Sequence, residues 1–305
     1  MAKAKDTCEY LIFRTFKFLF FLLPRRFCLF LGRAFGFLAY YLDKKRRKIA
    51  LSNLEIAFGK EWPESRRKKT ARDSLISFSQ TVADMIKLSH VGDKRKEKLM
   101  TVEGEENLQE ALKEGKGVLV FSAHLGNWEM GSFFISKVGR LDVVARALDN
   151  ELLEKELVKL RTNLGANVIY KKTAAKQILQ SLRRNAMVAI LIDQNVLRNE
   201  GVFVDFFGKE ASTTPALARF FLRTRSPIVP VFCYPTHSRC YRIKILKPLP
   251  IETEGDYPRD VLKITQLCTK IIESEIRQNP EFWFWFHNRW KSRPEKEKPI
   301  ENRAF

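Results

Sequence analysis

A histidine and a glutamate stand five positions apart in VLVFSAHLGNWEMGSFF, which covers residues 118–134. The imidazole of His124 can take up a proton near neutral pH. A carboxylate such as that of Glu129 can fix the tautomer of the ring and stabilise its protonated form. No G-x-S-x-G sequence supplies a nucleophilic serine. The spacing therefore suggests a general base, His124, oriented by Glu129 and acting directly on a substrate.

The elements around this pair are those expected to hold a reactive group in place. The run VLVFSA at 118–123 is apolar and rich in β-branched residues, which is typical of a buried strand. Asn127 is a good N-cap for the helix expected over 127–139, and Glu129 would lie in its first turn. In open α/β sheets, binding and reactive groups gather at the carboxyl ends of strands, where His124 would lie.

The rest of the chain predicts an α/β fold, with a mostly parallel central sheet flanked by helices, because strand and helix patterns alternate from Val102 onward. Two amphipathic helices are expected earlier, over 44–58 and from Pro63 to about Leu88. The expected strands are 118–123, 142–147, 167–170, 187–193, 227–234 and 240–249. The expected later helices are 106–117, 127–139, 151–165, 173–185, 214–225 and 260–278.

The charge of the chain is strongly positive and uneven. There are 55 Lys and Arg against 35 Asp and Glu, a formal net charge of +20. The first 48 residues contain twelve basic and three acidic residues, together with nine of the 24 Phe. Basic residues mixed with Phe and Leu favour an anionic membrane surface over nucleic acid, which is not expected as a partner.

Three structures are possible for the stretch from Tyr10 to Lys48. A cleaved signal peptide requires a small-residue cleavage site, but Pro24, Arg25 and Arg26 follow the apolar run instead. One tilted membrane span would place the two arginines near mid-membrane, at about 2.5–3.5 kcal/mol each. We favour a pair of interfacial helices broken at Pro24, with the tilted span as the alternative.

The five cysteines are scattered and none is in C-x-x-C spacing, which is against a disulfide framework or a zinc site. No metal and no cofactor are expected. The sequence divides into an N-terminal membrane anchor (1–43), a catalytic domain (44–294) and a charged tail (295–305).

Several stretches, in order, resemble the bacterial lipid A biosynthesis (late) acyltransferases, of the lauroyl or myristoyl acyltransferase type. SAHLGNWE resembles the H-x4-D/E motif of lipid acyltransferases. The resemblance covers roughly residues 10–294. Its other segments are ARALDN, LIDQN with GVFVDFFGKEASTTPALARF, and PEFWFWFHNRWKSRP.

The resemblance implies a glycerol-phosphate-acyltransferase-like fold at the cytoplasmic face of the bacterial inner membrane. It also implies transfer of an acyl group from a thioester, usually on acyl carrier protein, to a hydroxyl of a lipid A precursor or related glycolipid. His124 would be the base. Arg146 or backbone N–H groups near Gly126 and Asn127 would stabilise the oxyanion. Further substrate contacts are expected from Asp193, Arg161, Arg219 and Arg289.

Other functions remain open from the sequence. A lysophospholipid or another glycolipid could be the acceptor, with acyl-coenzyme A as the donor. The chain could also be a catalytically silent membrane-surface protein or a nucleic-acid-binding protein. Asp193 could hold Arg146 or a substrate hydroxyl, and Asn127 could act only as a helix cap.

Overall fold

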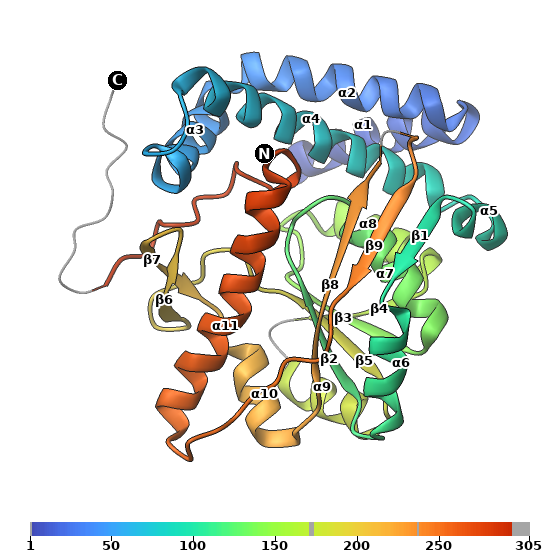
Figure 1. Cartoon of the computed structure of the whole chain (residues 1–305). Helices are drawn as coiled ribbons and strands as arrows, with labels where there is room; N and C mark the ends of the chain where they lie inside the picture. Colours follow the sequence, from blue (N-terminus) through green and yellow to red (C-terminus); the bar gives the residue numbers. More distant parts are fainter. Residues whose placement is uncertain (1, 171–173, 237, 295–305) are drawn as a thin grey trace.

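A seven-stranded sheet forms the centre of the protein (Figure 1). The computed structural model describes residues 2–170, 174–236 and 238–294 of the 305-residue chain. The strand order is β1-β9-β8-β2-β5-β3-β4, and only the pair β8–β9 in this sheet is antiparallel. This confirms the mixed α/β fold with a mostly parallel sheet. The strands are β1 (Met100–Glu103), β2 (Val118–Ser122), β3 (Leu141–Ala145), β4 (Ala166–Tyr170), β5 (Met187–Leu191), β8 (Ile228–Pro235) and β9 (Tyr241–Ile245).

Helices cover both faces of this sheet, so its central strands are apolar on both sides. Along β2, Val118 and Val120 pack against one layer of helices, whereas Leu119 and Phe121 pack against the other. The first layer contains α6 (Glu105–Lys113), α7 (Trp128–Val138) and α8 (Glu151–Asn163). The second layer contains α9 (Ala174–Arg183), α10 (Ala216–Thr224) and α11 (Tyr257–Gln278).

The chain changes face at the carboxyl ends of β2 and β5. After β2 it enters α7 in the first layer. After β5 it forms a hairpin of β6 (Val202–Phe206) and β7 (Lys209–Thr213) and then enters α10 in the second layer. Such a switch leaves a crevice beyond the strand ends, which is where ligands bind in open α/β sheets.

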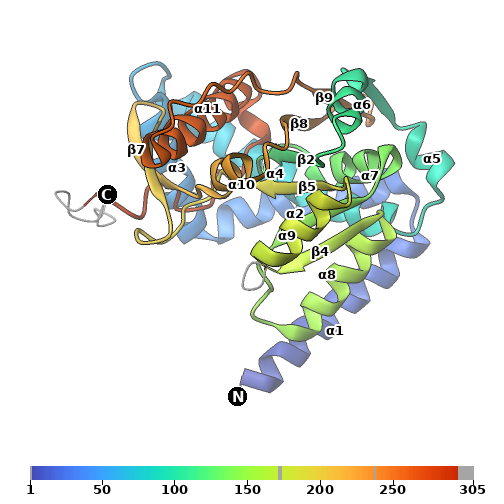
Figure 2. The ribbon, with the colours of Figure 1, turned by 90° about the horizontal axis from the view of Figure 1, so that it is seen from below.

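The first four helices of the chain are α1 (Ala2–Leu22), α2 (Arg25–Leu42), α3 (Lys44–Phe58) and α4 (Glu64–Leu88). The predicted break at Pro24 is confirmed, since α1 ends before it and α2 begins after it. Figure 1 shows α1, α2 and α4 together along one side of the molecule, and Figure 2 shows α1 beside α8. The Nζ of Lys17 in α1 lies 2.6 Å from the carboxylate of Glu156 in α8.

Helix α2 lies directly against α4, and two glycines allow this close approach. A Cβ atom added at Gly36 would lie 2.6 Å from the Cα of Ile76, and one at Gly32 would lie 3.0 Å from the carbonyl oxygen of Ser79. Both distances are shorter than ordinary packing contacts. The N-terminal helices are therefore packed into the fold on one side.

The other side of α1 and α2 is apolar and exposed. None of the helices that the structure describes is both long and apolar enough to cross a membrane. The large apolar side chains exposed on these two helices are Leu11, Ile12, Phe16, Phe18, Leu19, Phe21, Leu22, Phe27, Phe30, Phe35, Phe37, Leu38, Tyr41 and Leu42.

Some elements differ from the expectation. Strand β1, the short helix α5 (Asp93–Glu97), the hairpin β6–β7 and the 3-10 turn Pro280–Phe282 were not predicted. The strand expected over 240–249 ends at Ile245, and the helix expected over 106–117 ends at Lys113. The charged tail 295–305 lies outside the described residues.

Replacement of Gly36 should test the packing of α2 on α4. Gly36→Val forces the two helix backbones apart, and we expect the free energy of unfolding to fall by about 1–3 kcal/mol. Thermal or urea unfolding measures the change. Gly92→Ala is the matched control, because a Cβ at Gly92 meets nothing within 4 Å. Equal stability of the two variants would contradict this account of the packing.

Candidate active site

His124 and Asp193 meet at the switch point of the sheet. His124 follows β2, and Asp193 follows the neighbouring parallel strand β5. The Nδ1 atom of His124 lies 2.9 Å from Oδ1 of Asp193. The second oxygen, Oδ2, accepts hydrogen bonds from the backbone N–H of His124 at 3.0 Å and from Nε1 of Trp283 at 2.8 Å. The Asp193 side chain is 1% exposed and that of His124 is 24% exposed.

These contacts keep Asp193 ionised and select the tautomer of His124. Burial by itself would raise the pKa of Asp193. The charge and hydrogen bonds of His124 and the indole N–H of Trp283 outweigh burial and lower this pKa below its usual value. An ionised Asp193 only accepts hydrogen bonds, so it selects the tautomer with the proton on Nδ1. The Nε2 atom is then left with a lone pair that can accept a proton, as a general base requires.

Glu129 does not make the predicted contact with His124. Its Oε1 accepts hydrogen bonds from Arg161 in α8, from Nε at 3.1 Å and from Nη2 at 2.9 Å. The same oxygen accepts from Nε1 of Trp128 at 3.1 Å. The sequence prediction is corrected here, because the carboxylate that contacts the imidazole belongs to Asp193. The reason is geometric: Glu129 lies within the first turn of α7 and points toward α8, whereas the carboxyl end of β5 lies beside His124.

Glu129 is still linked to His124 through an aromatic side chain. The indole ring of Trp128 lies edge-on to the imidazole, with 5.0 Å between the ring centres. The ring of Trp128 also stacks on that of Phe78 in α4. Phe78 in turn contacts Phe284, with 4.6 Å between the ring centres. Trp128, Phe78 and Phe284 thus form an aromatic enclosure beside the imidazole. The Glu129 carboxylate holds Trp128 in place through a hydrogen bond.

Residues 124–127 form the turn between β2 and α7, which we call the catalytic turn. The backbone N–H of Gly126 donates to the carbonyl of Phe282 at 3.0 Å, and that of Asn127 donates to the carbonyl of Cys233 at 2.8 Å. Both donors are thus used within the protein, so the expected oxyanion donors near Gly126 are not free. Gly126 has φ +65°, and a Cβ there would lie 2.1 Å from the carbonyl oxygen of Cys233. Only glycine fits this position.

Asn127 has two structural roles in the turn. Its side-chain oxygen accepts from the backbone N–H of Met130 at 3.1 Å, which confirms the predicted N-cap of α7. Its Nδ2 donates to the hydroxyl of Tyr241 at 2.9 Å. Asn127 is 1% exposed.

The three remaining predicted arginines lie in different environments. Arg146, at the end of β3, has an 82% exposed side chain with only a 3.5 Å contact to Asp149, so Asp193 does not hold it. Arg219 is exposed on α10, in the other helix layer from α7. Arg289 is 1% exposed and donates to the carbonyl of Ser212, so the substrate contact expected of it is corrected to a contact within the protein.

The C-terminal aromatic segment supplies contacts that the sequence analysis did not identify. Trp283 binds Asp193, as described above. His287 Nε2 accepts from the backbone N–H of Asn195, two residues beyond Asp193, at 2.9 Å. Burial lowers the pKa of His287 to about 4, so this ring remains neutral near pH 7. The segment therefore holds the Asp193 loop. Nothing in the local spacing indicates this, because Trp283 and Asp193 are 90 positions apart.

A small cavity of about 50 Å³ adjoins the aromatic enclosure on the α7 and α8 side of the sheet. The Glu129–Arg161 pair lies at this cavity, whose other surfaces are mainly apolar. Its lining residues are Trp128, Glu129, Ser132, Val143, Val144, Ala145, Arg161, Ala189 and Leu191.

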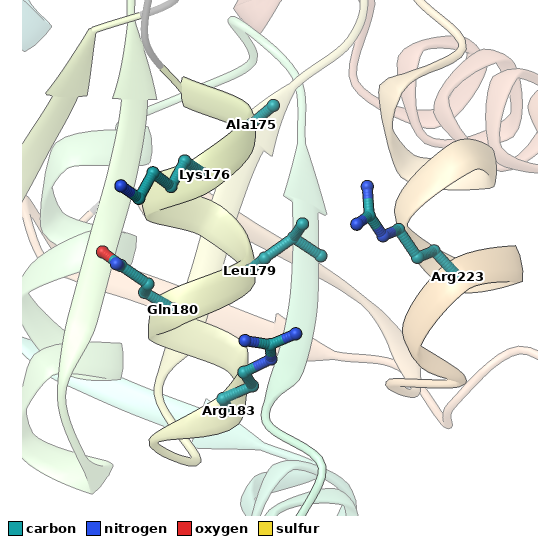
Figure 3. Close-up of a pocket in the computed structure, with 6 residues that line it drawn as sticks. All are labelled: Ala175, Lys176, Leu179, Gln180, Arg183 and Arg223. Atoms are coloured by element: carbon teal, nitrogen blue, oxygen red, sulfur yellow. The ribbon is translucent and has the colours of Figure 1, made fainter.

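A larger cavity of about 350 Å³ lies between α9 and α10, in the other helix layer. Figure 3 shows Arg183 of α9 and Arg223 of α10 on opposite sides of it, with Leu179 between them. No residue of the catalytic turn lines this cavity, which is therefore separate from the His124 site.

His124 thus contacts a buried carboxylate beyond the carboxyl end of a strand, and the sequence has no nucleophilic serine motif. The sequence model of the bacterial lipid A biosynthesis acyltransferases matches residues 5–292. The chain belongs to this family and is an O-acyltransferase.

Individual relatives are consistent with this assignment. The chain is 28% identical over 275 residues to the lipid A biosynthesis palmitoleoyltransferase of Escherichia coli, covering 89% of this chain and 87% of the relative. It is 27% identical to the lipid A biosynthesis lauroyltransferase of the same organism, covering 87% and 85%. It is 25% identical to the phosphatidylinositol mannoside acyltransferase of Mycobacterium tuberculosis, covering 71% and 69%.

Replacing each carboxylate by its amide should separate the two acids. Asp193→Asn allows the wrong tautomer of His124, and we expect kcat for acyl transfer to fall by about 10³-fold or more. Glu129→Gln leaves the Asp193 contact intact, so its kcat should fall by a smaller factor. Steady-state kinetics with an acyl thioester and a glycolipid acceptor measure both values. A larger loss in Glu129→Gln than in Asp193→Asn would show that Glu129 is the orienting acid.

Proposed function

We propose that this protein transfers a fatty acyl group from a thioester to a hydroxyl of a lipid A precursor or a related glycolipid. The observation that carries the proposal is the His124–Asp193 pair, which leaves Nε2 of His124 as a base at the edge of the sheet. Proton removal by a positioned base contributes typically about 10²–10⁴-fold to a reaction rate.

In the proposed reaction, His124 first takes up a proton from the acceptor and later gives it to the leaving thiolate. Nε2 of His124 removes the proton of the acceptor hydroxyl as its oxygen attacks the thioester carbonyl carbon. The carbonyl oxygen carries a negative charge in the tetrahedral intermediate, and Asp193 stabilises the imidazolium. When the intermediate collapses, the carbon–sulfur bond breaks and the thiolate takes the proton from the imidazolium. The products are an ester and a free thiol.

Charged residues at the site suggest how the substrates are held. Arg146 is an exposed cation next to Ala145, which lines the small cavity, and it is our candidate for contact with the oxyanion or with a substrate phosphate. The cation of Arg161 is committed to Glu129. The Glu129–Arg161 pair instead places polar groups at one side of the mainly apolar small cavity. A hydroxyl or an ester group of the acceptor can bind against these groups.

Charge and the named activities of relatives support the choice of substrates. Acyl carrier protein is our preferred donor, because an acidic carrier suits a chain of net charge +20, and coenzyme A thioesters are the alternative. The relatives in Escherichia coli are named for lipid A, and the mycobacterial relative is named for a mannosylated phosphatidylinositol. A glycolipid acceptor fits these names, and a lysophospholipid is the alternative.

The exposed face of α1 and α2 supports a location at the cytoplasmic surface of the inner membrane. Phe18, Phe30 and Phe35 are each more than 60% exposed. Exposed apolar areas of this extent are rare on proteins that remain in water. Basic residues such as Lys44 and Lys45 follow α2 and suit anionic headgroups. We propose that α1 and α2 lie in the interface, with α4 between them and the catalytic turn.

Loss of the base should abolish transfer. We expect His124→Ala to lower kcat by at least about 10²-fold without unfolding the protein, because the imidazole removes the hydroxyl proton. Mass spectrometry of the acylated acceptor measures the rate. His90→Ala is the matched control, since His90 is exposed beside Phe21 and away from the site. Unchanged transfer in His124→Ala would overturn the proposed function.

Removal of exposed phenylalanines should weaken membrane binding. Insertion of a Phe side chain is worth about 1.5–3 kcal/mol. We therefore expect the triple variant Phe18→Ser, Phe30→Ser and Phe35→Ser to bind anionic phosphatidylglycerol vesicles at least about tenfold more weakly in cosedimentation.

Leu197→Ser serves as the control for this experiment, because Leu197 is 64% exposed but lies in the loop after β5. If the triple variant binds vesicles as tightly as the wild-type protein does, α1 and α2 do not form the membrane surface.

A further inference from the structure

A buried ionic network connects the start of α2 to the core of the protein. Arg25, the first residue of α2, donates from Nε to Oδ1 of Asp84 at 2.7 Å and from Nη2 to Oδ2 at 2.5 Å. Its Nη1 donates to the carbonyl of Arg239 at 2.6 Å. The Asp84 side chain, on α4, is completely buried and that of Arg25 is 19% exposed. Two parallel hydrogen bonds between a guanidinium and a carboxylate fix both groups in position and orientation.

Tyr241 extends this network from α4 to β9. Its hydroxyl donates to Asp84. It also accepts from Nη2 of Arg25 at 3.4 Å and from Nδ2 of Asn127 at 2.9 Å. Tyr241 is 4% exposed, so each of these hydrogen bonds forms away from bulk water. Burial and the neighbouring carboxylate of Asp84 both raise the pKa of the phenol, which keeps its proton available for Asp84.

The network ends in the catalytic turn. Asn127 is the last residue of that turn and caps α7 through its other side-chain atom. Its amide therefore joins two sets of contacts, with the Tyr241 hydroxyl on one side and the first turn of α7 on the other. The carbonyl of Gly126 also accepts from Oγ1 of Thr81, one helical turn before Asp84 on α4. Helix α4 thus holds the turn that carries His124 directly through Thr81, and through Tyr241 of β9 from Asp84.

A buried ionic network contributes little net stability to a fold. Removing two charges from water costs several kcal/mol for each ion, and apolar side chains of similar volume often serve stability as well or better. What a buried ionic network supplies instead is one defined geometry, because each group has fixed partners in fixed directions. Here the network fixes the position of Asn127, three residues from the base.

We propose that Arg25, Asp84 and Tyr241 are positioning residues for the acyl transfer, acting on His124 through Asn127. The inference rests on the proposed function for its catalytic readout. It gives the N-terminal helices a role beyond membrane contact, because Arg25 belongs to the helix with the exposed apolar face. Displacement of a reacting group by about 1 Å can cost about 10²-fold in rate, so small shifts of the turn are sufficient.

A double-mutant cycle tests the route through Asn127. Tyr241→Phe removes the hydroxyl but keeps the ring, and Asn127→Ser keeps an N-cap but loses the amide. We expect Tyr241→Phe to lower kcat about tenfold, with KM for the donor changed by less than about twofold. In the Asn127→Ser background, Tyr241→Phe should lower kcat by less than about twofold, because the shared contact is already absent.

Lys87→Ala is the control. Lys87 ties α4 to α1 through the carbonyl of Phe21 at 3.0 Å and lies outside the network. Its kcat should equal that of the wild-type enzyme. Asp84→Asn is a poorer test, because it leaves the partly buried Arg25 without its anion and can unfold the protein.

A readout that does not require activity separates this inference from the proposed function. The chain has four histidines, so the ring resonances are few enough to resolve by NMR. Tyr241→Phe should shift the ring resonance of His124, whereas Lys87→Ala should not. If the wild-type protein transfers no acyl group but this shift is seen, positioning is supported and the proposed function fails. The inference is overturned if Tyr241→Phe leaves both kcat and the His124 resonance unchanged, or if the two substitutions reduce kcat independently.

Discussion

A carboxylate that is removed from water stays ionised only if other groups compensate its charge, and Asp193 has such groups on both oxygens. The His124 imidazole contacts Oδ1, and the indole of Trp283 and the backbone N–H of His124 contact Oδ2. These contacts require β2 and β5 to be neighbours and the C-terminal aromatic segment to return across the ends of both strands. Three distant parts of the chain therefore meet to hold one proton on Nδ1 of His124.

The need to hold His124 in one position also explains why the groups around it make so many hydrogen bonds within the protein. The catalytic turn is held by the C-terminal segment, by β8 and by α4, and its glycine is in a conformation that other residues rarely adopt. A turn with this many partners has little freedom to move. The cost is that the backbone N–H groups of Gly126 and Asn127 are no longer free for the substrate. The oxyanion must therefore be stabilised elsewhere, for which Arg146 is the candidate that we propose.

Helix α4 links the two functions proposed for this chain. One of its sides contacts α2 at Gly32 and Gly36, and its Phe78 and Thr81 contact the aromatic enclosure and the catalytic turn. The bodies of two packed helices, α2 and α4, thus lie between the exposed apolar face of α2 and the base. Through α4, the proposed membrane-contacting helices and the turn that carries His124 form one packed unit, which suits an enzyme whose acceptor is a lipid.

The sequence predicts the elements of this fold well where a pattern is local. The strand before His124, the cap at Asn127 and the break at Pro24 each depend on neighbouring residues, and all three are found in the structure. The sequence does not predict the hairpin β6–β7, because Phe206 and Phe207 follow one another directly before Gly208 and break the alternation of apolar and polar residues. The sequence also does not predict which carboxylate contacts the imidazole of His124. Asp193 was recognised as a strand-end residue, but its partner depends on strand order, which places β5 rather than α7 beside Nδ1 of His124.

A structure of the enzyme with its glycolipid acceptor and a non-reactive thioether analogue of the donor would test the central claim most directly. We expect the acceptor hydroxyl to lie within about 3.2 Å of Nε2 of His124, while Asp193 remains hydrogen-bonded to Nδ1. It would be contradicted by a hydroxyl held by Glu129, with the imidazole turned away from both Asp193 and the acceptor.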